Sequence, residues 1–189
     1  ERGLAVFAET FEAESGRMLA GKLGLVSLDR DGDDALLGEL FKLLEAVETD
    51  VTLFYRGLAA VPVDEAATDS ALIEPLTRAF YAEDARAPEY QGRLAGWLRR
   101  YAARVRQDGV PVPERVERMN RVNPKYVLRN YLAQQAIDAL AGGDASVMER
   151  LMEVLQRPYD EQPEHEELAG RRPEWARHKP GCSALSCSS

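Results

Sequence analysis

Apolar residues recur at steps of three and four positions along most of this chain, and this spacing limits its possible folds more than any other feature. Such a period places the apolar side chains on one face of an α-helix. The clearest set lies between residues 36 and 47: Leu36, Leu37, Leu40, Phe41, Leu44 and Val47. A second set, Leu4, Phe7, Phe11 and Met18, predicts a helix over about residues 3–20. We therefore predict an all-α fold.

The best candidate for a strand is VTLFY at residues 51–55. Neither a hairpin turn nor a neighbouring strand pattern accompanies it, so we assign it to a short helix capped by Thr49 or Asp50. Pro75 falls inside the next predicted helix, where a proline is unfavourable. The residues expected to begin the later helices are Thr68 or Asp69, Pro88, Asn123 with Pro124, and Asp144.

The composition of the chain changes at Pro158. Residues 1–157 carry the helical periodicity and are predicted to form one helical domain. Residues 158–189 contain four prolines, many charges and little apolar periodicity. We expect this segment to be an extended tail, ordered only where it lies on other parts of the protein.

The 189-residue chain is 45% apolar, which is enough for a substantial core, and its formal net charge is -8. A negative charge argues against binding to nucleic acid or to an anionic membrane surface, since phosphate groups attract basic patches. No stretch approaches the ~20 apolar residues of a membrane span, and the N-terminus lacks the basic-then-apolar order of a signal peptide. The two cysteines, Cys182 and Cys187, favour a reducing compartment such as the bacterial cytoplasm over a disulfide-rich secreted scaffold.

The segment DRDGDD at residues 29–34 is rich in carboxylates and therefore raises the possibility of a calcium site. An EF-hand loop needs glycine at its sixth position and glutamate at its twelfth. Counted from Asp29, the glycine is fourth and the twelfth residue is Leu40. We interpret the segment as a turn in which Asp33 or Asp34 caps the following helix.

His165, His178, Cys182 and Cys187 are conceivable zinc ligands. Structural zinc sites pair their ligands at short spacing, whereas the two histidines lie thirteen positions apart. A tail without bound metal is the favoured interpretation, and a metal-binding tail is the alternative.

Five arginines gather on one predicted helix. Arg93, Arg100 and Arg104 share a stripe, and Arg99 and Arg106 lie beside it. We interpret them as a solvent-exposed face, with a phosphate-facing or partner-facing patch as the alternative. The chain contains no glycine-rich loop with the spacing of a nucleotide-binding signature, so we expect no self-contained nucleotide site.

The segment RMNRVNPKYVLRNYLAQQAI, residues 118–137, mixes polar and apolar residues around its predicted helix. A helix on the surface would separate the two kinds of residue. Polar groups that are contacted on several sides need partners, because an unpaired buried polar group costs about 1–3 kcal/mol. Either those partners lie within this chain, or some of them lie on a domain outside it.

This segment, followed by VLQRPYDEQPEHEELAGRRPEWA (154–176) and the ending SCSS, closely resembles the C-terminal part of the selenoprotein O family, also called YdiU. KLGL at 22–25 and TDVTLFYRGL at 49–58 resemble two earlier blocks of the same region, in the same order. Val51 departs from the aromatic residue expected at its position.

The resemblance implies a protein-kinase-like fold and protein adenylyltransferase activity, in which AMP passes from ATP, with Mg2+ or Mn2+, to Ser, Thr or Tyr hydroxyls of protein substrates. It also implies that the catalytic, nucleotide-binding and metal-binding residues lie upstream, so none is assigned to this chain. A chain that begins with Glu1 rather than Met agrees with a C-terminal helical region whose kinase-like N-terminal domain is missing. Alone, this region is expected to be inactive and to bind no cofactor. The alternative is a stand-alone helical protein-interaction module.

The resemblance also suggests a redox role for Cys187. The family tail carries a cysteine or selenocysteine close to its last residue, and in bacterial members ending in SCSS it can form a disulfide with the kinase-like domain. Cys187 is the matching residue, whereas Cys182 has no family role. A disulfide that closes a long loop has a large entropic effect. Judged without the resemblance, two inert tail thiols would be the simpler interpretation.

Overall fold

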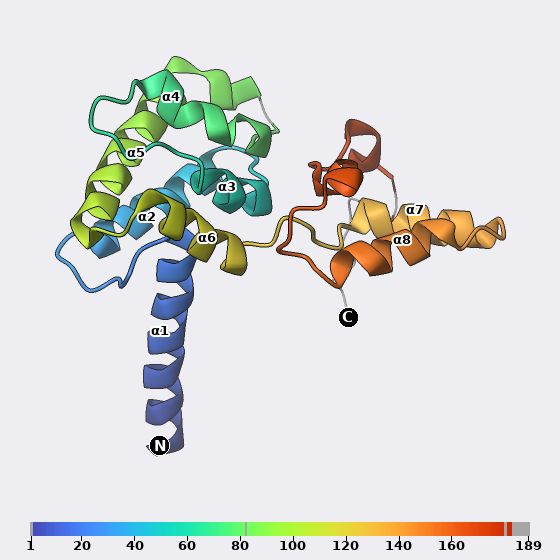
Figure 1. Ribbon diagram of the computed structural model, residues 1–189, viewed down its shortest axis with the longest axis horizontal. Coiled ribbons are helices and arrows are strands. Elements are labelled where there is room, and N and C mark those ends of the chain that lie inside the picture. The colour runs from blue at the N-terminus through green and yellow to red at the C-terminus, as the bar shows by residue number, and fades with distance from the viewer. Residues whose placement is uncertain (1, 82, 180, 183–189) are drawn as a thin grey trace. The chain divides into compact units, whose positions relative to one another are not determined.

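The computed structural model describes residues 2–81, 83–179, 181 and 182, without the side chains of residues 2–6, 8 and 9. This part of the chain consists of helices and loops, with one isolated antiparallel bridge between Thr49 and Phe80 (Figure 1). The predicted all-helical class is therefore confirmed for the residues described. None of the helices in these ranges combines the length and the apolar character needed to cross a membrane.

The α-helices are α1 (Arg2–Leu23), α2 (Asp33–Ala46), α3 (Val51–Leu58), α4 (Asp69–Ile73), α5 (Pro88–Asp108), α6 (Val112–Val122), α7 (Asn130–Ala141) and α8 (Ser146–Leu155). The 3-10 helices are η1 (Glu74–Ala79), η2 (Glu83–Arg86), η3 (Pro163–Ala169) and η4 (Glu174–Arg177).

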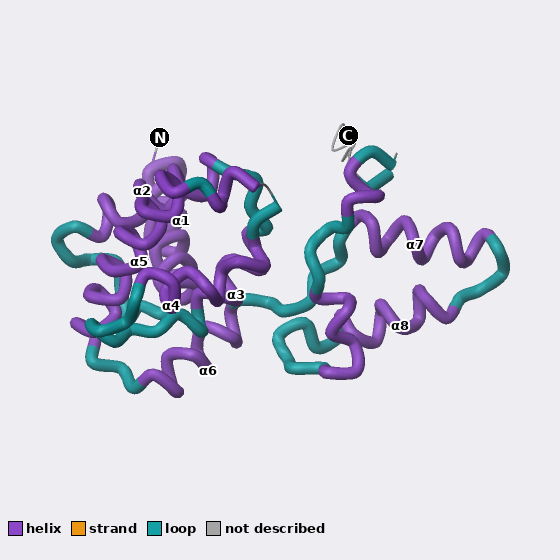
Figure 2. The backbone as a smooth tube through the Cα atoms, turned by 90° about the horizontal axis from the view of Figure 1, so that it is seen from above, coloured by secondary structure: helices purple, strands orange, loops and turns teal. Residues whose placement is uncertain are grey.

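The chain divides into two compact units, residues 1–123 and residues 124–189. This division differs from the boundary at 157/158 that the composition predicts. In the second unit, α7 and α8 form a helical hairpin (Figure 2), and η3 and η4 bury Leu168, Ala169 and Ala176 in the same cluster. The prolines exclude long α-helices from this segment, but they permit short 3-10 turns that bring apolar residues onto the hairpin.

In the first unit, α5 carries more buried residues than any other helix. Its aromatic residues are Tyr90, Trp97 and Tyr101, and each is at most 5% exposed. Each also donates a hydrogen bond to a backbone carbonyl of another helix: Tyr90 to Leu43 O at 3.2 Å, Trp97 to Leu36 O at 2.9 Å, and Tyr101 to Leu23 O at 2.7 Å. Burial raises the pKa values of Tyr90 and Tyr101 to about 12, so both remain protonated donors. These bonds fix α1 and α2 against α5.

The sequence-based helix starts before α3, α4 and α5 are confirmed. The Asp50 side chain accepts a hydrogen bond from Leu53 N at 3.1 Å, and the Thr68 hydroxyl accepts one from Ala71 N at 3.2 Å. Pro88 is the first residue of α5. Pro75 follows the end of α4 and lies in η1, because a proline has no N–H to continue an α-helical ladder.

The predicted helix start at Asn123 and Pro124 is wrong. Asn123 is the C-terminal cap of α6, and α7 begins only at Asn130. The backbone N–H groups of Lys125 and Tyr126 both donate to Pro158 O, at 2.8 and 3.0 Å. These two bonds hold residues 125 and 126 against Pro158, and residues 124–129 form a connecting segment between α6 and α7.

The glycine of the block TDVTLFYRGL allows α3 to contact the backbone of η1. A Cβ atom at Gly57 would lie 2.6 Å from Pro75 O and 3.3 Å from Leu76 Cδ2.

Replacement Gly57→Ala should therefore destabilise the first unit by about 1–3 kcal/mol through overpacking. Gly38→Ala is the matched control, since a Cβ there meets no described atom within 4 Å. It should stabilise α2 by up to about 1 kcal/mol. Urea unfolding monitored by circular dichroism would measure the free energy of unfolding of both variants. Equal changes in the two variants would contradict the close contact between Gly57 and η1.

Candidate functional site

Three of the sequence blocks meet at the C-terminal end of α6. Lys22 Nζ lies 5.2 Å from the centroid of the Tyr55 ring and 3.4 Å from Asn123 Oδ1. Asn123 Nδ2 donates to Lys22 O at 2.9 Å. Arg56 Nη1 donates to Asn120 O at 3.0 Å and to Asn123 O at 2.9 Å. The Arg56 guanidinium thus satisfies carbonyl groups that the end of a helix leaves unpaired, and its charge suits that end.

The block KLGL forms the turn after α1. Gly24 has a positive φ of 68°, which favours glycine, and a Cβ there would lie 2.6 Å from Met119 Sδ. Leu23 and Leu25 on either side are buried at 0% and 1% exposure. This block is therefore a turn that packs closely against α6, and it is not a phosphate-binding loop.

Sequence reasoning missed Arg115, which is 1% exposed. Its guanidinium donates to Tyr101 Oη at 3.0 Å and to Ala59 O at 3.1 Å, so it joins α6 to α5 and to the end of α3. The available signal was its position four residues before Met119, which places both residues on one face of the helix.

The later blocks meet in the second unit. Tyr126 is 1% exposed and donates to Gln162 O at 2.8 Å. Lys125 pairs with Glu161 at 2.6 Å and with Glu166. Many polar groups of the segment at residues 118–137 thus find partners within the chain, which supports the first of the two interpretations above.

The arginine stripe is only partly a solvent-exposed face. Arg104 is 6% exposed, so that interpretation is wrong for this residue. Its guanidinium binds Asp33 through Nε at 2.7 Å and Asp108 through Nη1 at 2.7 Å, and donates to Ser27 O at 2.8 Å. Arg99 is exposed and pairs with Asp69. The sequence did not reveal the buried pair, because the carboxylate of Asp33 is distant in the sequence.

Asp33 belongs to the segment DRDGDD, and it does not cap α2 with its side chain. Gly32 occupies the cap position, and no side-chain cap bond is formed there. Burial alone would raise the pKa of Asp33, but the hydrogen bonds from Arg104 and from the Arg30 N–H outweigh it and lower the pKa. The segment thus anchors α2 to α5 through one buried ion pair.

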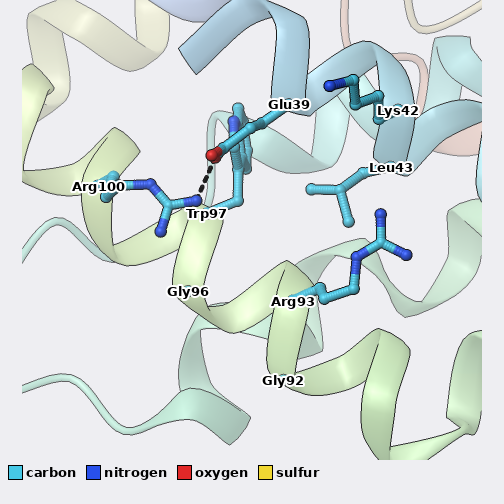
Figure 3. Close-up of a pocket in the computed structure, with 8 residues that line it drawn as sticks. All are labelled: Glu39, Lys42, Leu43, Gly92, Arg93, Gly96, Trp97 and Arg100. Carbon is cyan, nitrogen blue, oxygen red and sulfur yellow. Dashed lines mark hydrogen bonds and ion pairs between the residues drawn. The ribbon is translucent and has the colours of Figure 1, made fainter. Parts of the chain in front are cut away.

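A groove of about 300 Å³ lies between α2 and α5 (Figure 3). Its cationic residues are Lys42, Arg93 and Arg100. Arg100 pairs with Glu39, whereas Lys42 and Arg93 make no hydrogen bond or ion pair with the described residues. The groove can attract an anion, but its carboxylate is already paired, so it offers no free general base.

The proposed zinc ligands do not form a cluster in the part of the chain that is described. No group of three or more His, Cys, Asp or Glu residues lies close enough there to hold a metal ion. Cys182 is 4% exposed and belongs to the apolar cluster of the second unit. Cys187 lies outside the described residues. We assign none of the described residues to binding a nucleotide or its metal.

Comparison with known proteins agrees with the family resemblance that these sequence blocks carry. The sequence profile of the family "Protein adenylyltransferase SelO" matches residues 1–156. Over the whole chain, the protein nucleotidyltransferase YdiU of Nitrosospira multiformis is 56% identical, that of Rhodopirellula baltica 49% and that of Tolumonas auensis 48%. The chain covers 37%, 36% and 35% of these three proteins, so it spans only about a third of their length.

These relatives are protein nucleotidyltransferases, which is the class of protein that the blocks indicate. The chain belongs to the SelO, or YdiU, family of protein adenylyltransferases.

The Asp33–Arg104 pair gives the first unit a pH-dependent stability. The folded state lowers the pKa of Asp33, so the stabilisation is present above the unfolded pKa of about 4 and is lost as pH falls through the folded pKa. At pH 7, Asp33→Asn should destabilise the unit by about 1–3 kcal/mol, and this difference should shrink below pH 4.

Urea unfolding would measure the effect through Trp97 fluorescence, with Trp175→Phe removing the second tryptophan. Asp69→Asn is the matched control, because its pair with Arg99 is exposed and should contribute less than about 1 kcal/mol. A pH-independent effect of Asp33→Asn would contradict this role for the pair.

Proposed function

We propose that this chain is a helical C-terminal region of a protein adenylyltransferase that transfers AMP from ATP to Ser, Thr or Tyr hydroxyls of proteins. In this proposal the kinase-like domain that binds ATP and Mg2+ or Mn2+ belongs to the rest of the enzyme. The helical region supports that domain and is inactive by itself. The observation that carries the proposal is a family match over residues 1–156 in a chain that spans about a third of its relatives.

The polar contacts within the region favour a structural role for it. Its family blocks use their charged and polar groups on one another: Lys22 on Asn123, Arg56 on the end of α6, and Lys125 on Glu161. Charged and polar side chains that are paired in this way stabilise the junctions between helices, and they are not available to bind a substrate. The groove between α2 and α5 lacks a free base, as described above.

A second part of the proposal concerns Cys187. We infer that its thiol forms a disulfide with a cysteine of the kinase-like domain. Both thiols then lose their protons and together give up two electrons to a small-molecule disulfide, which is reduced to two thiols. The burial of Cys182 supports assigning this role to Cys187, because a buried thiol reacts slowly.

The activity assignment is tested by measuring AMP transfer from labelled ATP with Mg2+ or Mn2+. The full-length enzyme should label itself or added proteins, whereas the 189-residue chain should show no transfer above background. Robust transfer by the chain alone would refute the proposed division of labour. Absence of transfer by an intact, folded full-length enzyme would refute the assigned activity.

The redox assignment is tested by treating the full-length enzyme with oxidised glutathione. We expect a dithiothreitol-sensitive shift in non-reducing electrophoresis that Cys187→Ser abolishes. Cys182→Ser should leave the shift in place, because that thiol is 4% exposed within an apolar cluster. A shift that depends on Cys182, or one that survives Cys187→Ser, would contradict the assignment.

A further inference from the structure

One side of α1 carries large apolar residues that contact water. At about 100° per residue, Phe7, Phe11 and Met18 fall within about 40° of one another around the helix. Their exposed fractions are 67%, 61% and 55%. The rings of Phe7 and Phe11 stack with centroids 6.1 Å apart. These three residues are called the α1 apolar face below.

Near the C-terminal end of α1, the opposite side of the helix packs on the rest of the first unit. Ala20 and Leu23 lie roughly half a turn around the helix from the α1 apolar face, and they are buried at 3% and 0% exposure. Met18 precedes Ala20 by only two residues and is still exposed. The α1 apolar face is therefore uncovered even where α1 meets other helices, and not only along the N-terminal part that projects from the unit in Figure 1.

A helix with apolar residues on two opposite sides is typical of a helix buried between two bodies. A surface helix would carry polar residues on the side away from its core. Two adjacent phenylalanines with a methionine form an apolar patch of the kind that marks an interaction site. The family profile includes this helix, since it matches residues 1–156.

We propose that the α1 apolar face binds the part of the adenylyltransferase that lies outside this chain. The inference rests on the proposed function, because it identifies the partner as the remainder of the same enzyme. The chain covers 37% and 36% of its Nitrosospira and Rhodopirellula relatives, so roughly two thirds of each relative lies outside the matched region. A polypeptide of that length forms its own core and has an apolar surface to offer.

The test compares the double replacement of Phe7→Ser with Phe11→Ser in two contexts, the full-length enzyme and this chain alone. In the full-length enzyme the thermal unfolding midpoint should fall by about 4 °C or more, because two buried rings are lost. In the chain alone the midpoint should change by less than about 1 °C beyond the control, because both side chains are already exposed.

The matched control is Glu12→Ser with Ala13→Ser, two exposed positions of the same helix that lie away from the α1 apolar face. It introduces the same two serines, and because Glu and Ala are better helix formers than Phe, it gives an upper limit on the effect of lost helix propensity. The double replacement Phe7→Leu with Phe11→Leu should retain most of the full-length midpoint, because leucine keeps the face apolar.

An unchanged midpoint in the full-length enzyme would overturn the proposal. Sedimentation provides a second readout: a full-length dimer that Phe7→Ser with Phe11→Ser dissociates would show instead that a second copy occupies the face. Neither readout depends on AMP transfer. Failure of this proposal is therefore distinguishable from failure of the proposed function.

Discussion

The first unit depends on the burial of α5, whose aromatic residues can be buried only if their polar atoms find acceptors. Tyr90, Trp97 and Tyr101 satisfy this requirement with backbone carbonyls of α1 and α2. An unpaired donor in this core would cost about 1–3 kcal/mol, so each bond restricts where a neighbouring helix can lie. The turn after α1 and the ion pair of Arg104 follow from that arrangement, since both connect elements that α5 holds together.

The residues that carry the family resemblance mainly connect helices to one another. Arg56 binds the last carbonyls of α6, and Lys22 binds Asn123 from the end of α1. In the second unit, Tyr126 binds the backbone at Gln162, and Lys125 pairs with acidic residues nearby. Such contacts explain why long polar motifs occur in a region that has no visible catalytic group among its described residues. They stabilise the two units of the chain.

Local signals predicted much of the fold. The caps at Asp50 and Thr68 and the proline at the start of α5 were readable because each acts within four residues of itself. The same kind of signal failed at Asn123. There the residue before a proline suggested a helix start, but distant partners hold this residue at a helix end. The predicted helix cap at Asp33 was wrong for a similar reason, because its carboxylate binds Arg104 and not the nearby helix N-terminus.

By itself, the sequence determined the helical class, the positions of most helices and the family, because these depend on periodicity, short-range capping and long matching blocks. Only the tertiary structure decided that Arg104 and Arg115 are buried, that residues 158–179 pack on α7 and α8, and that α1 is apolar on a side its own unit leaves uncovered. Burial and pairing depend on residues far apart in the chain. Periodicity identifies an apolar face, but it cannot identify what covers that face.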